Sequence, residues 1–177
     1  MAEKEKTGDL MRNIIKPKID KLDYGFKILS NGLKVLLISD PDTNKSSAAL
    51  GVNIGYLVDK KDAQGLAHFC EHLLFMGSEK YPDENDYRAY LAKNDYRAYL
   101  EKNGGFSNAS TSRDRTIFYF DVSNEAFEGA LDRFAQFFIC PLFNEGSVES
   151  EIIAVDNEFS NNLNNKLLII IIIALNH

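Results

Sequence analysis

The sequence feature that most constrains the fold is the pattern H-x-x-E-H formed by His68, Glu71 and His72. The surrounding stretch 65–76 has the apolar spacing of a helix and stops before Gly77, a residue type that commonly ends helices. On such a helix Glu71 lies at about 300° and His72 at about 40° from His68. The pattern therefore predicts a helix with three chemically reactive side chains on one face.

Two imidazoles four residues apart are a common pair of Zn²⁺ ligands, with Zn–N distances of about 2.0–2.1 Å. A glutamate beside them can take a proton from a metal-bound water. Cys70 falls near 200°, on the opposite face, which predicts a small buried apolar residue rather than a ligand. Chance produces such a pattern in roughly one chain in a hundred of this length. A chance pair of histidines remains the alternative, because a zinc site requires a third ligand.

A second predicted helix, from residue 148 to about 163, offers candidate third ligands. Glu151 and Glu158 are seven residues apart, which places them about 20° from each other on one helix face. The apolar run 152–155 indicates that this helix is packed, and a carboxylate on a packed helix needs a partner. Taken alone, however, this helix favours a solvated glutamate pair over a metal site.

The remaining segments predict strands mixed with helices. Residues 26–39 read as a hairpin with a two-residue Asn31-Gly32 turn, because Asn-Gly supplies the positive φ angles that such a turn needs. Further strands are predicted at 48–55 and 115–122, and a helix at 124–138 with Ser123 as its N-cap and Pro141 beyond its end. This arrangement predicts an α+β fold, with helices packed against a mostly antiparallel sheet.

Composition limits the function classes. Apolar residues make up 45% of the 177 residues and charged residues 26%, which is typical of a folded domain. A net charge of −6 argues against a nucleic-acid partner. Two cysteines cannot form a disulfide framework, so we expect a reducing compartment and a cytoplasmic location. A mitochondrial location is the alternative, although the first ten residues do not resemble a transit peptide.

A nine-residue unit occurs twice in tandem: 85–93 reads NDYRAYLAK and 94–102 reads NDYRAYLEK. Nine residues rotate a straight helix by a net half turn, so the two copies would present their apolar stripes on opposite sides. We therefore expect either that one copy bulges out or that the helix breaks near Lys93-Asn94.

Several motifs occur in a characteristic order between about Tyr24 and Asn162: HFCEHLLFMG, YPDEN, FSNAS, FYFDVS, EGALDRFAQFF followed by CPLF, and AVDNE. Together they strongly resemble the N-terminal catalytic domain of the inverted-zinc-motif peptidases of the insulinase type. The resemblance implies the α+β module shared by LuxS and M16 metallopeptidases, incomplete here at its C-terminus. Removing the nine duplicated residues restores the family's usual spacing between His72 and Glu158, so the duplication is an insertion into an intact frame.

The resemblance also implies a role for each site residue. His68, His72 and Glu158 would bind one Zn²⁺ per chain, and Glu71 would be the catalytic base. Glu151 would support the site by contacting a ligand rather than the ion.

Substrate contacts are implied for the segment 106–111, which matches the family's edge strand that pairs with substrate backbone. Asn108 and Ala109 match the positions facing the scissile peptide, and Ser110 stands where the family has a bulky aromatic residue. Phe75 lies at about 340° on the motif helix, where it could line a substrate pocket or pack in the core.

We therefore expect a flexible segment at 1–23, a partial zinc-peptidase domain at 24–163 carrying the duplication at 85–102, and an aberrant apolar tail at 164–177. The apolar run 167–175 is too short to span a bilayer, which takes about 20 residues. The predicted function is a zinc metalloendopeptidase that cleaves peptides by glutamate-assisted attack of a zinc-bound water. The alternative is a catalytically defective fragment that binds peptides or assembles with other chains. The partners would be peptide substrates and the remaining domains of a longer chain or a second subunit.

Overall fold

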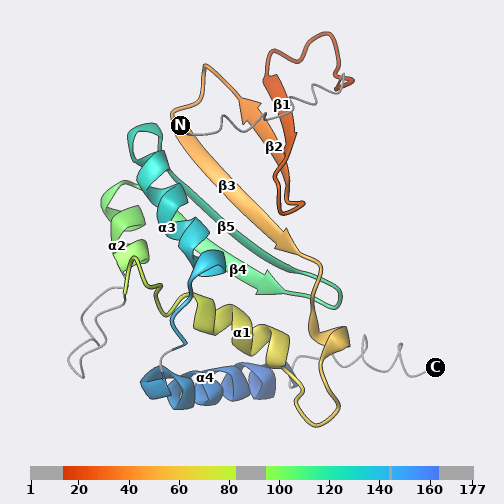
Figure 1. Cartoon of the computed structure of the whole chain (residues 1–177), viewed down its shortest axis with the longest axis vertical. Helices are drawn as coiled ribbons and strands as arrows, with labels where there is room; N and C mark the ends of the chain where they lie inside the picture. Colours follow the sequence, from red (N-terminus) through yellow and green to blue (C-terminus); the bar gives the residue numbers. More distant parts are fainter. Residues whose placement is uncertain (1–13, 83–94, 144, 164–177) are drawn as a thin grey trace, which may run out of the picture. The chain divides into compact units, whose positions relative to one another are not determined.

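The computed structural model describes residues 14–82, 95–143 and 145–163 (Figure 1). The chain forms two compact units, Met1–Asn44 and Lys45–His177, and each is described by itself. The predicted domain boundaries at 23/24 and 163/164 stay predictions.

The described part of the first unit contains a hairpin. Strand β1 (Asp23–Ile28) pairs antiparallel with β2 (Lys34–Ser39), which confirms the predicted pairing. Leucine and isoleucine side chains of β2 are more than half exposed within this chain: Leu36, Leu37 and Ile38.

The turn of this hairpin differs from the prediction. Only Gly32 has a positive φ angle, of 85°, so the predicted two-residue Asn31-Gly32 turn is wrong. The backbone N–H of Gly32 donates to the Leu29 carbonyl (2.9 Å), and the Leu29 N–H donates to the Leu33 carbonyl (2.9 Å). These bonds define a three-residue loop in which glycine takes the left-handed position. The Asn31 side chain accepts from the Leu33 N–H (3.0 Å), which holds Asn31 in an ordinary turn conformation.

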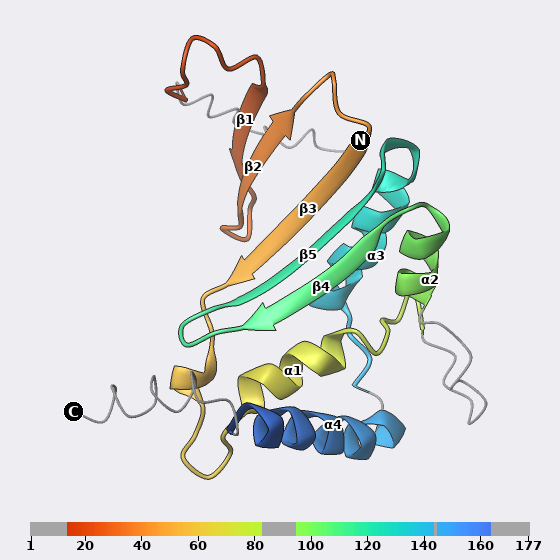
Figure 2. The same cartoon turned by 180° about the vertical axis from the view of Figure 1, so that it is seen from behind.

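The second unit is built on a three-stranded antiparallel sheet. Its strands are β3 (Lys45–Val52), β4 (Phe106–Thr111) and β5 (Thr116–Ser123), in the order β3-β5-β4. Figures 1 and 2 show α2 (Asp95–Lys102) and α3 (Phe127–Ile139) on one face of this sheet. The predicted α+β architecture is confirmed.

The core lies between the sheet and these helices. Strand β5 alternates strictly, so Phe118, Phe120 and Val122 are buried while their neighbours are half-buried. Phe134 and Phe137 of α3 pack against them. The apolar spacing of both elements in the sequence follows directly from this single buried layer.

Helix α3 begins later than predicted. A short 3-10 helix, η2 (Asn124–Ala126), lies between β5 and α3, and Ser123 makes no side-chain cap bond. The predicted N-cap role of Ser123 is therefore wrong. The chain tightens into the 3-10 turn first, and the Tyr99 hydroxyl donates to the Ala126 carbonyl (3.2 Å) where α3 starts.

Helix α2 carries the second copy of the tandem repeat. Tyr96 and Leu100 are 2% and 0% exposed, so this copy is an integral part of the core. Burial raises the pKa of the Tyr96 phenol well above its ordinary value. The first copy and the expected break near Lys93-Asn94 lie outside the described residues.

Two helices lie across one end of the sheet. Helix α1 (Leu66–Leu74) follows the 3-10 helix η1 (Tyr56–Val58), and α4 (Glu145–Leu163) packs against α1 (Figure 1). Both helices were predicted. Helix α1 ends at Leu74 with Phe75 as its C-cap, so the predicted end before Gly77 is wrong by two residues. Gly77 has a φ of 105° in the segment beyond the helix.

Candidate metal centre

The N-terminus of α1 is fixed by Asp59. Its Oδ2 accepts from the Gly65 N–H (2.8 Å) and its Oδ1 from the Ala67 N–H (3.0 Å). A carboxylate there satisfies two otherwise unpaired donors and complements the helix dipole. Gly65 has a φ of 89°, which a residue with a side chain would adopt only under strain. Asp59 thus sets where the metal-motif helix begins.

The C-terminal end of α1 is anchored in the core. Phe75 is 7% exposed, and its ring centroid lies 5.2 Å from that of Phe137 and 6.1 Å from that of Phe118. Of the two alternatives predicted for Phe75, this position favours core packing over a substrate pocket.

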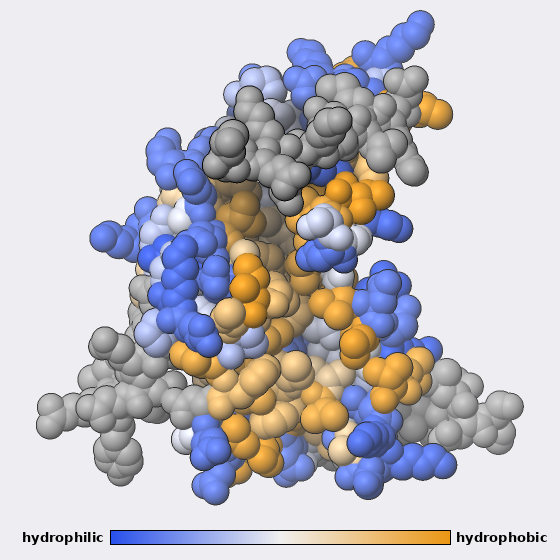
Figure 3. Space-filling model, in the orientation of Figure 1, coloured by the Kyte–Doolittle hydropathy of each residue, from blue (hydrophilic) through white to orange (hydrophobic). Residues whose placement is uncertain are grey.

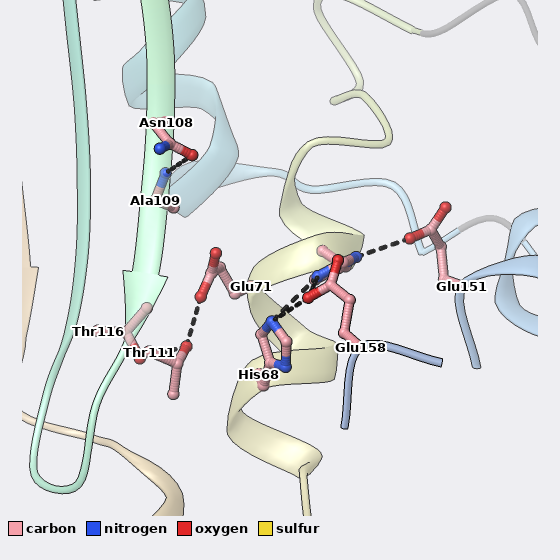
Figure 4. A network of polar contacts seen from close by, with 9 residues as sticks. His68, Glu71, Asn108, Ala109, Thr111, Thr116, Glu151 and Glu158 are labelled. Carbon is pink, nitrogen blue, oxygen red and sulfur yellow. Dashed lines mark hydrogen bonds and ion pairs between the residues drawn. The ribbon is translucent and has the colours of Figure 1, made fainter. Parts of the chain in front are cut away.

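The two histidines of the motif meet one carboxylate from α4 (Figure 4). Their Nε2 atoms lie 3.1 Å apart, and Oε2 of Glu158 lies 3.4 Å from Nε2 of His68 and 3.9 Å from Nε2 of His72. In the described part of the chain, these three side chains form the group whose geometry could hold a metal ion. His72 and Glu158 are separated by 85 residues in the sequence, and the packing of α4 on α1 brings them together.

Glu151 lies on the far side of His72 from this triangle. Its Oε2 is 2.9 Å from His72 Nδ1. Because an ionised carboxylate only accepts hydrogen bonds, this contact favours the His72 tautomer with its proton on Nδ1, which leaves Nε2 as the possible ligand atom. This position agrees with the supporting role that the family resemblance implies for Glu151, and that role stays a prediction.

The separations fit a bound divalent ion. Ligand bonds of about 2.0–2.1 Å in a tetrahedral arrangement place two donor atoms about 3.3 Å apart. The observed separations of 3.1, 3.4 and 3.9 Å lie close to that value. Two imidazoles and a carboxylate are also a donor set that zinc accepts, and a cation would balance the Glu158 charge.

Glu71 extends from α1 toward β4 rather than toward α4 (Figure 4). It is 8% exposed, and its Oε2 accepts a hydrogen bond of 2.6 Å from the Thr111 hydroxyl. A buried carboxylate with such a donor is fixed in position next to the ligand pair. Thr111 was not singled out from the sequence, because its role depends on how α1 packs against β4.

Strand β4 lies at an edge of the three-stranded sheet, as the resemblance implies. Asn108 is exposed and Ala109 is half-buried against the core, since neighbouring residues of a strand point to opposite faces. The Asn108 side chain accepts from the Ala109 N–H (2.9 Å). Ser110 is exposed and lies beside Tyr56 and Arg113 in an open depression.

Cys70 does not behave as predicted. It is exposed, whereas the sequence predicts burial. Its helical angle is as expected, but the described residues leave that side of α1 uncovered, so the prediction of a buried residue is wrong within this chain.

Residues 34–171 match the family described as Insulinase (Peptidase family M16). This chain belongs to that family. It is 53% identical to insulin-degrading enzyme of Homo sapiens over 153 residues, and 49% identical to the A-factor-processing enzyme of Saccharomyces cerevisiae over 167 residues. These matches cover 86% and 94% of this chain, but only 14% and 15% of the relatives.

A solved structure agrees with these matches. The crystal structure of pitrilysin superposes with a TM-score of 0.77 at 40% identity, covering 85% of this chain and 15% of that one. The chain therefore spans about a seventh of the length of these relatives. In the described residues, no helix has the length and apolar character needed to cross a membrane.

Proposed function

We propose that this chain provides the metal-binding half of a zinc metalloendopeptidase site, with His68, His72 and Glu158 holding one Zn²⁺ per chain. The single observation that carries the proposal is the convergence of three donor atoms at separations of 3.1–3.9 Å. A relative from Schizosaccharomyces pombe, 47% identical over 163 residues, is named putative zinc protease, which supports zinc as the ion.

Each residue then has a chemical task. The zinc ion supplies Lewis acidity and lowers the pKa of water at the site. Glu71 accepts a proton from the attacking water and returns it to the leaving amine, which is general acid–base catalysis. Glu151 keeps His72 in the tautomer that presents Nε2 to the ion.

The exposed edge of β4 would hold the substrate. An extended peptide could add to this edge as a further strand through backbone hydrogen bonds. Asn108 and Ala109 would then lie beside the scissile bond. The small side chain of Ser110 would leave room for a larger substrate side chain there.

A second candidate function is a peptide-binding or assembly module without activity of its own. The observation that favours it is the edge position of β4, which could pair with a peptide backbone whether or not a metal is bound. In this case the remaining parts of a longer chain, or a second subunit, would complete the catalytic site.

Metal analysis and peptide cleavage distinguish the two. We would measure zinc per chain and the hydrolysis of a quenched fluorogenic peptide for the wild type, for Glu71→Gln and for Glu149→Gln. Glu149 is an exposed carboxylate on another face of α4, so it controls for loss of charge. One zinc per chain with a loss of about 10²–10⁴-fold in Glu71→Gln alone supports the peptidase. Zinc without cleavage supports the binding module, and absence of zinc binding overturns the metal site.

A further inference from the structure

We propose that Thr111 is a positioning residue that holds the Glu71 carboxylate in its working orientation, and that Thr116 supports it from the neighbouring strand. The inference rests on the proposed role of Glu71 as base. It concerns the side of the site away from the metal ligands, where α1 meets the sheet.

The carboxylate and the two hydroxyls form a continuous line of contacts. Thr111 Oγ1 lies 2.6 Å from Glu71 Oε2 and 3.2 Å from Thr116 Oγ1, and Thr116 Oγ1 lies 2.9 Å from the Ile54 carbonyl oxygen. The line thus runs from α1 across β4 and β5 to the segment that follows β3. It ends on a backbone group, which does not reorient as a side chain does.

The number of hydroxyl protons decides which of the two threonines donates to Glu71. An ionised carboxylate and a carbonyl only accept, so the single hydroxyl proton of Thr111 goes to Glu71. The proton of Thr116 has two acceptors, and the Ile54 carbonyl is the nearer one. Thr111 is therefore the direct holder of Glu71. Thr116, whose proton goes to the Ile54 carbonyl, donates no hydrogen bond to Thr111 and supports it through the 3.2 Å contact alone.

The register of the β4–β5 pair fixes the positions of these two threonines relative to each other. Thr111 and Thr116 are directly opposite each other in the antiparallel β4–β5 pair, one on each side of the turn that joins the strands. Thr116 is 6% exposed and Thr111 is half-buried. A β-branched side chain in a strand has few rotamers, so each hydroxyl points in a defined direction.

As a consequence, the two carboxylate oxygens of Glu71 have different roles. With Oε2 of Glu71 bound to Thr111, Oε1 is the oxygen left to accept a proton from water among the contacts of the described residues. Glu71 is otherwise a flexible side chain between two ligands on one helix face. A fixed oxygen position matters because small misplacements of a reacting group reduce rates by up to about 100-fold.

The test compares Thr111→Val, which keeps the shape but removes the hydroxyl, with Thr111→Ser, which keeps the hydroxyl. Thr116→Val tests the second contact. Ser107→Ala is the matched control, since Ser107 lies on the same face of β4 and loses a hydroxyl that does not contact Glu71. Thermal melts of every variant establish that each is folded.

The first readout does not need activity. The chain without metal is labelled with ¹³C at glutamate carboxyl carbons, and the Glu71 resonance is identified by its loss in Glu71→Gln. We expect this resonance to move in Thr111→Val, to move less in Thr116→Val, and to stay in place in Thr111→Ser and Ser107→Ala. An unmoved resonance in folded Thr111→Val overturns the inference, whatever the activity shows.

The second readout is kinetic. We expect kcat for the fluorogenic peptide to fall about 10–100-fold in Thr111→Val with KM and zinc affinity unchanged, and to recover in Thr111→Ser. A displaced resonance with an unchanged kcat in an active chain overturns the positioning role. If instead the resonance responds as expected while Glu71→Gln cleaves as well as the wild type, the hydrogen bond stands and the proposed role of Glu71 as base fails.

Discussion

The two helices that build the candidate metal centre are held in different ways. Helix α1 has its N-terminus capped by Asp59, its Glu71 bonded to Thr111, and its C-terminal end anchored by Phe75 in the core. Helix α4 has no fully buried side chain among its described residues, and Ile152, Ile153 and Phe159 are each more than half exposed. Figure 3 shows apolar atoms reaching the surface in this region.

The site therefore has two different halves. The half on α1 is held in place by the protein, whereas the half on α4 depends on what Glu158 binds. Helix α1 is held by contacts within the protein that do not involve an ion. Glu158 has a side chain that is 53% exposed, and it gains a fixed position mainly by binding something. Under the proposed function, metal binding and the packing of α4 would therefore be coupled, as expected when ligands come from separate elements.

The largest expected contrast is in the apolar anchors of the two helices. Phe75→Ala should lower the free energy of unfolding by about 3–5 kcal/mol, because it leaves a cavity in an aromatic core. Phe159→Ala should cost less than about 1 kcal/mol, because the side chain is 54% exposed. Chemical denaturation of both variants measures the difference.

Equal losses in the free energy of unfolding would show that α4 is as firmly packed as α1, contrary to the difference between the two helices. An unchanged stability in Phe75→Ala combined with a raised KM would restore the substrate-pocket alternative for that residue.

The second contrast is between the two carboxylates of α4. Glu158→Gln should weaken zinc binding by more than about 100-fold, since it replaces a proposed ligand. Glu151→Gln should weaken it by roughly 10–100-fold, since it replaces the charged acceptor of the His72 Nδ1 proton by a neutral one. Competition with a fluorescent chelator gives both affinities. A larger loss in Glu151→Gln would exchange the roles of the two residues.

The sequence predicted the features of α1 more directly than those of α4. The helical spacing of His68, Glu71 and His72 is local, so their common face was predictable from angles alone. The alternation of β5 likewise predicted its buried side, because a strand has only two faces. Glu158 and Glu151 needed the family resemblance as well, since the helix that carries them does not by itself indicate a metal.

The contacts that fix the site were not predictable, because they join segments through tertiary packing. Asp59 caps α1 from a loop, eight residues before Ala67, and so it is not at the usual N-cap position. Thr111 reaches Glu71 only through the β4–β5 register and the packing of α1 on β4. The exposure of Cys70 depends on what covers the outer side of α1, which helical periodicity does not determine.

A smaller effect tests how α1 is prearranged. Asp59→Ala removes two hydrogen bonds to the first turn of α1 and should lower the free energy of unfolding by about 1 kcal/mol, within the range of lost helix caps. Asp59→Asn is the matched variant, since it keeps an acceptor and should lose less. Urea denaturation of both measures the effect. If neither changes stability while zinc affinity falls, the cap orients the helix without stabilising the fold.

The smallest expected effect concerns the tandem repeat. The second copy already fills the core with Tyr96 and Leu100, so deleting 85–93 should leave that packing intact. Bringing residues 82 and 95 nine residues closer in the sequence should stabilise the chain by about 0.5 kcal/mol or less, because the entropy of chain closure changes slowly with length. Deleting 94–102 leaves a sequence that differs from the first deletion only by alanine in place of Glu101, so both variants should melt at nearly the same temperature, slightly above the wild type. A lower melting temperature in both would show that the first copy is also packed and that the duplication has become part of the fold.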